Sequence, residues 1–501
     1  MSASDHESWV ALMEDEQLVE ILFDRPDQGR LLGDIYLGKV EAVLPGIQAA
    51  FVDIGTDKAG FLHVSDVETG EDEEDGEGGG GRRRQKKYPP MQDLIKKGQN
   101  LVVQVTKEPI STKGPRLTAE ISLPGRFLVY MPGSSHVGVS RKIEDRDERS
   151  RLRKLAKSIL PKDSGGIIVR TVSEELNEDT FEKDFKRLHA VWKKILKKKE
   201  GARAPALLRR EAKLISGVIR DLFSNRFESI TVDDKAIYTE ILQYVKNVAP
   251  DLKDRVRLHT DTVALFDKYG VEEGIQGAFE KKVVMPSGGY IIIEPTEALV
   301  SIDVNTGRYT GKKDPEHTIL KTNLDAAGEI ARQLRLRDIG GIIVCDFIDM
   351  ESQQHRDRVL QELRTHLARD RARTKAYEVS GLGLVEMTRQ RVRPSLFNSL
   401  TKTCDHCDGG GRVYTPTTVV RQIERSLSRV AAKGDERQIM IRMHPEVTLR
   451  ILEDEPDFLR RLRRHTKLSL DMRDDPLLRE GEFRILSGAA ETDVTARYAA
   501  A

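Results

Sequence analysis

The sequence predicts a multidomain α+β protein, and three observations lead to this fold class. A chain of 501 residues is too long for one compact core, and ordinary domain sizes suggest about three domains. Residues 33–123 hold short apolar segments separated by glycines and turn residues, which is typical of a small sheet. Residues 281–394 alternate strand-like and helix-like stretches, as expected for helices packed on a sheet.

The charge balance is close to zero, because 82 lysines and arginines face 81 aspartates and glutamates. A net charge of +1 does not exclude a nucleic-acid partner, since 33% charged residues can still form one basic face. Three cysteines exclude a disulfide framework and indicate a reducing compartment. The first 20 residues have no signal-peptide pattern, and the longest apolar runs are strand-sized. We therefore expect a soluble, cytoplasmic protein without a membrane span.

The strand-like region begins at Gly33, whereas the residues before it have a helix-like pattern. Five short strands in about 90 residues are typical of a small closed barrel of the OB type. The expected strands are 35–44, 48–54, 60–64, 101–107 and 116–122. Between the third and the fourth, 71–87 combines six acidic residues, four consecutive glycines and a basic cluster. Such opposed charge blocks cannot bury apolar surface, so this segment is predicted to be a flexible inserted loop.

Helical periodicity begins near Asp179, where apolar residues recur at three- and four-residue steps, namely Phe181, Phe185, Leu188, Trp192 and Ile195. The stretch 181–215 carries twelve basic and four acidic residues, a local net charge of 12 − 4 = +8. It is either a solvated helix face or an approach surface for phosphate backbones. Pro205 suits the first turn of a further helix, which we expect to run to about Phe223.

Asp303 and Asp346 each stand at the end of a hydrophobic strand, in 298–305 and 341–347. If these strands are neighbours, the two carboxylates face one cleft, and hard oxygen ligands with open positions suit Mg²⁺. The metal would polarise a phosphodiester and lower the pKa of an attacking water. Asn305 lies on the same strand face as Asp303 and would add an amide ligand or orient the carboxylate. The alternative is that both aspartates only satisfy turn amides at strand ends.

Cys404-Asp-His-Cys407, followed by glycines, is half of a zinc knuckle. A tetrahedral structural site needs four ligands, and the third cysteine, Cys345, lies in an apolar strand and is better interpreted as core. Two chains would then each contribute one cysteine pair to a shared Zn²⁺. The alternative is a reduced loop without metal.

Two further groups of residues are candidates for contacts with a nucleic acid. Phe51, Phe61 and Lys113 fall in the predicted barrel, where aromatic side chains stack on bases and a lysine contacts phosphate. The alternative for each phenylalanine is a place in the core. Arg170 and Thr171 end an apolar strand, where a guanidinium fork and a hydroxyl would capture a terminal phosphate. An ordinary surface strand end is the alternative.

Six stretches resemble the ribonuclease E/G family, in the family's order along the chain. They are Gln48-Ala-Ala-Phe-Val-Asp-Ile-Gly55, Gly60-Phe-Leu-His63, Ser301-Ile-Asp-Val-Asn-Thr-Gly307, Ala331-Arg-Gln-Leu-Arg-Leu-Arg337, Gly340-Gly-Ile-Ile-Val-Cys-Asp-Phe-Ile-Asp349 and Gly383-Leu-Val-Glu-Met-Thr-Arg389. The resemblance implies an endoribonuclease that cuts single-stranded RNA and leaves a 5′-phosphate on the downstream product. Its implied substrates are ribosomal RNA precursors and messenger RNA.

The resemblance also implies a domain order. An S1 (OB-fold) domain and a 5′-phosphate sensor would be inserted in an RNase H-like domain, followed by a DNase I-like catalytic domain, a zinc link and a small C-terminal α+β domain. The implied ranges are 1–34 plus 215–278 for the RNase H-like domain, 35–124 for the S1 domain, 125–214 for the sensor, 279–400 for the catalytic domain, 401–415 for the zinc link and 416–501 for the C-terminal domain. The chain length alone suggests about three domains, which is fewer than the resemblance implies.

The family's functional residues have counterparts at matching positions. By the resemblance, Asp303 and Asp346 would hold catalytic Mg²⁺ with Asn305 assisting, and Arg170 with Thr171 would read a 5′-monophosphate. The rival interpretations are a non-catalytic S1-type RNA-binding protein and a related phosphodiesterase that acts on DNA.

The remaining counterparts concern RNA contacts and assembly. Phe51, Phe61 and Lys113 match the RNA contacts of the S1 domain. Cys404 and Cys407 match a Zn²⁺ link between the two chains of a homodimer, often within a tetramer. Asp405 replaces the proline of the family pattern, but both cysteines and the later glycines remain. We therefore still expect zinc to be shared.

Overall fold

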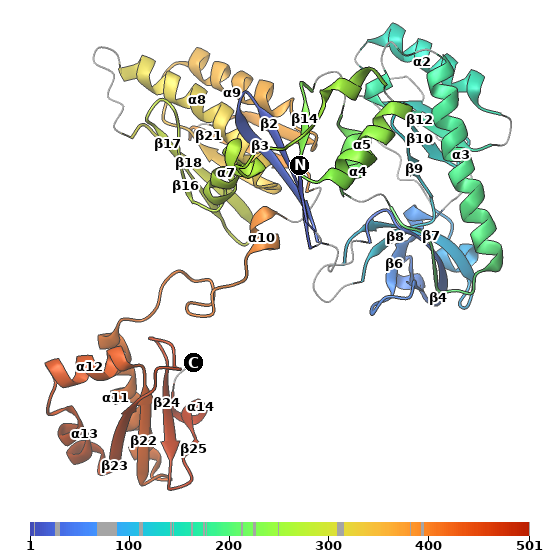
Figure 1. Cartoon of the computed structure of the whole chain (residues 1–501). Coiled ribbons are helices and arrows are strands. Elements are labelled where there is room, and N and C mark those ends of the chain that lie inside the picture. Colours follow the sequence, from blue (N-terminus) through green and yellow to red (C-terminus); the bar gives the residue numbers. More distant parts are fainter. Residues whose placement is uncertain are drawn as a thin grey trace. The chain divides into compact units, whose positions relative to one another are not determined.

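The computed structural model describes residues 1–501 with the exception of short gaps, and it shows two units, Met1–Ser395 and Leu396–Ala501 (Figure 1). The gaps are 5, 26–30, 68–87, 110–113, 141–142, 144, 162–163, 174–175, 177, 212–213, 224–226, 249, 308–314, 381, 392–394 and 500–501. The predicted loop 71–87 and Lys113 lie outside the described residues. Both units mix helices and strands, so the predicted multidomain α+β class is confirmed. Within the described ranges, no helix is long and apolar enough to cross a lipid bilayer.

The chain begins with three antiparallel strands, β1 (Ser2–Ala3), β2 (Ser8–Glu14) and β3 (Gln17–Asp24). The helix-like pattern expected before Gly33 is therefore wrong. The physical reason is that β3 is covered on both faces, by helices from different parts of the chain. Its residues from Leu18 to Leu22 are all buried, so the strand lacks the alternation that marks a half-exposed strand.

The predicted five-stranded barrel is confirmed. Its strands are β4 (Ile35–Leu44), β5 (Ala49–Asp53), β6 (Gly60–His63), β8 (Arg116–Thr118) and β7 (Asn100–Lys107), in this spatial order, with connections η2 (Pro45–Ile47), η3 (Val64–Asp66) and α1 (Met91–Leu94). Strand β7 pairs back with β4, so the sheet closes. Val52, Leu62 and Leu117 fill the interior and are 0% exposed.

A sixth strand, β13 (Ala206–Arg209), extends the barrel sheet by pairing with the start of β4. The helix expected from Pro205 to about Phe223 is therefore wrong, because only α4 (Leu214–Asp221) is helical there. Leu207 packs against the barrel core and Leu208 against the neighbouring core. Burial of adjacent residues on opposite faces favours a strand over a helix.

A second sheet follows the barrel and is covered by two helices. It consists of β11 (Val137–Val139), β12 (Gly166–Val169), β10 (Leu128–Met131) and β9 (Leu123–Pro124), accompanied by α2 (Arg146–Ile159), η4 (Thr171–Ser173) and α3 (Glu178–Gly201). On α3 the predicted apolar face is buried through Phe181, Phe185, Leu188 and Ile195. Helix α3 therefore buries one stripe and exposes its lysines on the other side.

Residues from the chain start share a core with residues 214–256. The elements that follow α4 are β14 (Ile230–Val232), α5 (Lys235–Val248), η5 (Pro250–Arg255), β15 (Val256–Leu258), α6 (Leu265–Lys268) and α7 (Val271–Gly277). Val10 of β2 and Leu22 of β3 pack with Ile219 of α4 and Val245 of α5. This core brings together segments that are far apart in the sequence.

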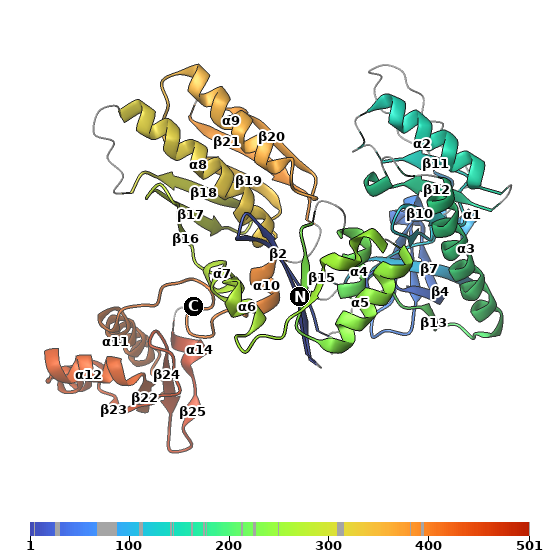
Figure 2. The same cartoon turned by 45° about the horizontal axis from the view of Figure 1, so that its top comes forward.

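A second six-stranded sheet of the first unit, called the large sheet below, carries helices on one face only in the described part of the chain (Figure 2). Its strands are β16 (Lys282–Val284), β17 (Tyr290–Pro295), β18 (Leu299–Asn305), β19 (Gly341–Asp346), β21 (Leu384–Arg389) and β20 (Thr374–Val379), in this spatial order, and its helices are α8 (Pro315–Leu336) and α9 (Gln353–Leu367). Ile302, Ile343 and Cys345 point to the helices and are 0% exposed. The opposite face of the sheet is open.

The second unit is a small α+β fold with its own core. It contains α10 (Leu396–Leu400), α11 (Pro416–Lys433), β22 (Gln438–Met443), α12 (Pro445–Asp454), α13 (Phe458–Thr466), β23 (Ser469–Asp474), β24 (Phe483–Ser487), β25 (Thr492–Asp493) and α14 (Thr495–Tyr498). The strands follow the order β23-β22-β24-β25. Residues 405–409, between α10 and α11, form turns, and the exposed Cys404 and the partly exposed Cys407 lie in this connection.

Candidate functional site

Asp303 and Asp346 lie side by side on the open face of the large sheet. Strands β18 and β19 are parallel neighbours, and their register pairs Asp303 with Asp346. Neighbouring strands lie about 4.8 Å apart, and register partners point to the same face. The residues that alternate with them, Ile302, Val304 and Cys345, are buried. Asp346 is the last residue of β19, but Asp303 lies within β18, so only one of the two stands at a strand end.

Asn305 and Asp349 complete the polar surroundings of this pair. The Asn305 amide Nδ2 donates a hydrogen bond of 2.7 Å to Oδ2 of Asp303, so it orients that carboxylate. Burial raises the pKa of Asp346 above its ordinary value, and the negative charges of Asp303 and Asp349 raise it further. Carboxylates crowded in this way favour a bound cation, because positive charge stabilises their ionised form.

The helices beneath the sheet hold the backbone that carries these carboxylates. Asn323 of α8 is fully buried, and its amide Nδ2 donates to the carbonyl of Ile348 (2.8 Å) while its Oδ1 accepts from the Ile348 N–H (3.1 Å). The segment between Asp346 and Asp349 is therefore fixed by two hydrogen bonds from one side chain. At the end of β18, Gly307 has a φ of +63°, and a Cβ there would lie 2.4 Å from the Gly288 carbonyl oxygen. Only glycine allows this close passage.

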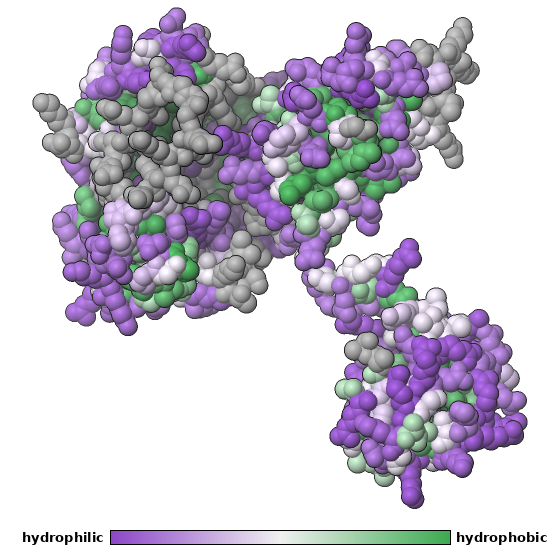
Figure 3. Space-filling model, turned by 180° about the vertical axis from the view of Figure 1, so that it is seen from behind, coloured by the Kyte–Doolittle hydropathy of each residue, from purple (hydrophilic) through white to green (hydrophobic). Residues whose placement is uncertain are grey.

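Apolar side chains lie on the same open face as the carboxylate pair. Val284 of β16 is 67% exposed and Ile342 of β19 is 53% exposed. Figure 3 shows an apolar area on the part of the first unit that holds this sheet. The same face also carries charge, because Glu294 of β17 and Glu386 of β21 are exposed and lie on the same side of the sheet as the carboxylate pair.

The possible metal ligands on this face fit Mg²⁺ better than structural Zn²⁺. In the described part of the chain, no group of three or more His, Cys, Asp or Glu side chains is placed to hold a metal ion. Two carboxylates with an adjacent amide fit Mg²⁺, which binds few protein ligands and keeps waters or substrate phosphates in its other positions. They do not fit structural Zn²⁺, which needs four protein ligands.

Phe51 and Phe61 form an aromatic pair on the outer face of the barrel. They are partners across β5 and β6, with ring centroids 6.0 Å apart in an edge-to-face arrangement. Both are partly exposed, whereas their neighbours Val52 and Leu62 are buried, so the pair does not belong to the barrel core. Arg116 is the partner of Phe61 on β8, and its guanidinium Nη2 forms an ion pair of 2.7 Å with Asp66. This surface can stack on bases and contact phosphate.

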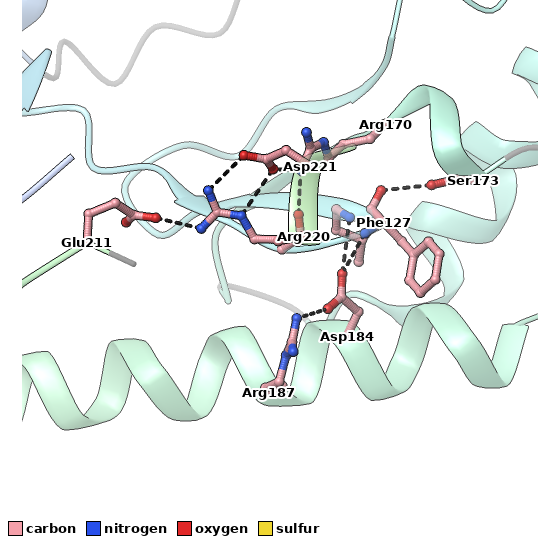
Figure 4. Close-up of polar contacts among 10 residues, drawn as sticks. Phe127, Arg170, Ser173, Asp184, Arg187, Glu211, Arg220 and Asp221 are labelled. Carbon is pink, nitrogen blue, oxygen red and sulfur yellow. Dashed lines mark hydrogen bonds and ion pairs between the residues drawn. The ribbon is translucent and has the colours of Figure 1, made fainter. Parts of the chain in front are cut away.

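Arg170 and Thr171 follow β12, as the sequence predicted for the end of an apolar strand. The guanidinium Nη1 of Arg170 donates to Oδ1 of Asp221 (2.6 Å) and to the carbonyl oxygen of Gly125 (2.7 Å). Asp221 also forms an ion pair with Arg220, which in turn binds Glu211 (Figure 4). The candidate phosphate reader is therefore part of a charged network.

Cys404 and Cys407 lie in one tight turn of the second unit. The Gly411 N–H donates to Sγ of Cys407 (3.3 Å), and N–H groups of Cys407 and His406 lower the pKa of the Cys404 thiol below its ordinary value. Thiolates are the form that binds Zn²⁺, so this turn fits half of a tetrahedral site. The His406 ring faces Glu480, with Nε2 4.0 Å from its carboxylate oxygen. Cys345 is buried, as predicted.

Three residues near these groups were absent from the sequence prediction. Arg116 is recognisable only once β6 and β8 are known to pair, although it is the first residue of the predicted strand 116–122. Asp349 is the one of the three that a local pattern could have identified, since it lies three residues after Asp346 in the same motif. Asp221 lies 51 positions from Arg170, so no local pattern connects them.

Comparison with known proteins adds an independent observation. The family model described as "Ribonuclease E/G family" matches residues 122–392. Ribonuclease G of Haemophilus influenzae is 40% identical over 455 residues, which cover 91% of this chain and 92% of that protein. Ribonuclease G of Escherichia coli K12 is 38% identical over 486 residues, covering 97% and 98%. Ribonuclease E of Nostoc is 40% identical over 415 residues, covering 82% of this chain but 58% of that protein.

Proposed function

This chain belongs to the ribonuclease E/G family and is an endoribonuclease, a hydrolase that acts in RNA processing, and we propose that it cleaves single-stranded RNA in a Mg²⁺-dependent reaction. The proposed products carry a 5′-phosphate, and the proposed substrates are ribosomal RNA precursors and messenger RNA. The observation that carries the proposal is the register pairing of Asp303 with Asp346 on an open sheet face.

In the proposed reaction, Asp303 and Asp346 hold Mg²⁺ and Asn305 orients the Asp303 carboxylate. When bound, the ion would supply positive charge to the phosphodiester and lower the pKa of an attacking water. The chain's own contribution is geometric, because Asn323 fixes the backbone after Asp346.

The barrel is proposed to draw RNA toward this sheet. Phe51 and Phe61 stack on bases, and Lys113 contacts phosphate. The partial exposure of the aromatic pair, whose chain neighbours Val52 and Leu62 are buried, supports this role.

A 5′-monophosphate at the RNA end is proposed to bind Arg170 and Thr171. A guanidinium can form two parallel hydrogen bonds to a phosphate, and a hydroxyl can add a third. RNA that carries a 5′-monophosphate should therefore be cleaved in preference to RNA that ends in a hydroxyl.

The assembly and domain assignments are also proposals. Cys404 and Cys407 would share one Zn²⁺ with the same pair of a second chain, which gives a homodimer and allows a tetramer. The proposed domains are RNase H-like (1–34 plus 215–278), S1 (35–124), sensor (125–214), DNase I-like catalytic (279–400), zinc link (401–415) and small C-terminal (416–501). The shared core of Val10 and Ile219 supports the first of these, because it joins the two halves of that domain.

The test is an incubation of the purified protein with a short 5′-monophosphorylated single-stranded RNA, with and without Mg²⁺. We expect cleavage only with Mg²⁺, and products whose downstream fragment carries a 5′-phosphate. Binding without cleavage would instead support a non-catalytic S1-type RNA-binding protein. Equal cleavage of a DNA oligomer of the same sequence would contradict a ribonuclease.

A further inference from the structure

Four charged side chains form a continuous row that ends at Arg170 (Figure 4). Glu211 Oε1 accepts from Nη1 of Arg220 at 2.5 Å, and Arg220 binds both oxygens of Asp221, through Nε at 3.1 Å and Nη2 at 3.0 Å. Asp221 Oδ1 then accepts from Nη1 of Arg170 at 2.6 Å. The row alternates in sign, so each member is neutralised by its neighbours.

The far end of this row is anchored at the barrel. The Glu211 N–H donates to Oδ1 of Asp34 (2.7 Å), and Asp34 is only 1% exposed. Glu211 passes so close to Gly33 that a Cβ there would lie 2.8 Å from the Glu211 Cγ atom. Arg220 and Asp221 come from the end of α4, whose apolar side is buried. The charged row is therefore fixed at Glu211, and Arg170 lies at its other end.

Only one nitrogen of the Arg170 side chain is used by this row. Nη1 of Arg170 donates to Asp221 and to the Gly125 carbonyl. Within the described part of the chain, Nε and Nη2 of Arg170 donate no hydrogen bond. The side chain is 24% exposed. A guanidinium fork binds a phosphate through two adjacent nitrogens, and the Nε–Nη2 edge is such a pair.

We propose that Asp221, held by Arg220, is a positioning residue that fixes Arg170 by Nη1 and thereby presents its Nε–Nη2 edge to the 5′-monophosphate of an RNA end. The inference rests on the proposed function, in which Arg170 reads that phosphate. Asp221 thus sets the enzyme's preference for the chemical state of the 5′ end without touching the RNA.

A competing role for Asp221, as an internal anion that blocks Arg170, fits the geometry less well. Asp221 already accepts two hydrogen bonds from Arg220. The Gly125 carbonyl would still accept a hydrogen bond from Nη1 of Arg170 if Asp221 moved away. An incoming phosphate can bind the Nε–Nη2 pair without displacing Asp221 from Nη1. Burial opposes ionisation of Asp221, but the hydrogen bonds and charge of Arg220, and then of Arg170, lower its pKa below the ordinary value. The carboxylate therefore stays charged at neutral pH.

The experiment compares kcat and KM for one RNA sequence with either a 5′-monophosphate or a 5′-hydroxyl. The preference is the ratio of kcat/KM for the two substrates. For Asp221→Ala we expect this ratio to fall about tenfold, as for the loss of one charge-assisted hydrogen bond. The loss should appear as a higher KM for the monophosphorylated RNA alone. Asp221→Asn keeps an acceptor for Nη1 and should restore part of the ratio.

Two further variants separate this inference from other outcomes. Glu182→Ala removes an exposed ion pair with Lys186 on nearby α3 and should leave the ratio unchanged. Arg220→Lys cannot bind both oxygens of Asp221, so it should also lower the ratio, and it replaces Asp221→Ala if that variant does not fold.

Each remaining outcome would overturn a specific statement. A higher ratio in Asp221→Ala would identify Asp221 as a competitor of phosphate. An unchanged ratio, or equal slowing of both substrates, would leave Asp221 with a structural role at most. If Arg170→Ala retains the wild-type ratio, the proposed 5′-phosphate reading fails as well. If Arg170→Ala loses it and Asp221→Ala does not, only the present inference fails.

Discussion

Asp303 and Asp346 are direct register partners on two parallel strands, although 43 positions separate them (346 − 303) in the sequence. Helix α8 lies between β18 and β19 in the chain and covers the face opposite to the two carboxylates. A parallel pair needs such a crossover, and the crossover leaves the other face free. The same arrangement that makes the strands neighbours therefore exposes their carboxylates together.

The first prediction concerns this pair. Asp303→Asn and Asp346→Asn should each lower kcat at least about a hundredfold, because each loses a charged ligand of the proposed Mg²⁺. RNA binding should persist, since the barrel is untouched. The matched control is Glu294→Gln, an exposed carboxylate of the same sheet that pairs with Lys281. Full cleavage by either aspartate variant would remove that residue from the proposed metal site.

Removal of the metal is the second prediction. Treatment with a chelator should abolish cleavage, and added Mg²⁺ should restore it within the mixing time, because two carboxylates on an open face exchange ions readily. Restoration of cleavage by Zn²⁺ but not by Mg²⁺ would contradict the assignment from the donor set. Cleavage that survives exhaustive chelation would show that the carboxylates act without a metal.

Much of the carboxylate site could be predicted because its signals are local. Asp303 and Asp346 interrupt apolar strands, and Asn305 follows at the two-residue period of a strand face. Asp221 could not be predicted in this way, since its contact with Arg170 arises only when α4 and β12 meet in space.

The errors in the fold have a common physical cause. Strands β3 and β13 are each buried on two faces, so neither shows the alternation that identifies a strand at the edge of a core. Strand β6 of the barrel does alternate, with Gly60 and Leu62 buried and Phe61 and His63 partly exposed. A strand of this kind can be recognised from the sequence because one side faces the packed interior and the other faces solvent.

The third prediction concerns the aromatic pair of the barrel. Phe51→Ala and Phe61→Ala should each weaken RNA binding by about 1–3 kcal/mol, the usual loss for one base stacked on a ring. Binding is measured by fluorescence anisotropy in an Asp303→Asn background, so that the RNA stays intact. Leu44→Ala is the control, because Leu44 is a 39% exposed apolar residue of the same barrel. Equal losses in all three variants would indicate damage to the barrel instead of lost stacking.

The fourth prediction concerns metal content. If two chains share one ion, elemental analysis should give about half a zinc per chain. Cys404→Ser should remove the zinc and shift the assembly toward monomers in sedimentation experiments. Cys345→Ala is the control, because Cys345 is buried in the sheet core and should not affect zinc. One zinc per chain, or an unchanged assembly in Cys404→Ser, would contradict sharing.

A buried ion cluster connects the end of β21 to the helices of the large sheet. Arg389 is 5% exposed, and its Nε donates to Oδ2 of Asp370 (2.7 Å) while its Nη1 donates to Oδ1 of Asp338 (2.8 Å). Both aspartates are nearly as buried. A cation between two buried carboxylates contributes little net stability, but its removal leaves both charges uncompensated.

The fifth prediction follows from this cluster. Arg389→Met should destabilise the first unit by about 3–5 kcal/mol, measured as the shift of the denaturant midpoint followed by tryptophan fluorescence. Both tryptophans of the chain, Trp9 and Trp192, lie in that unit and report on it selectively. The triple variant with Asp338→Asn and Asp370→Asn should recover part of the loss, because neutral amides need no buried cation. If the triple variant is as unstable as Arg389→Met, lost packing and not uncompensated charge accounts for the destabilisation.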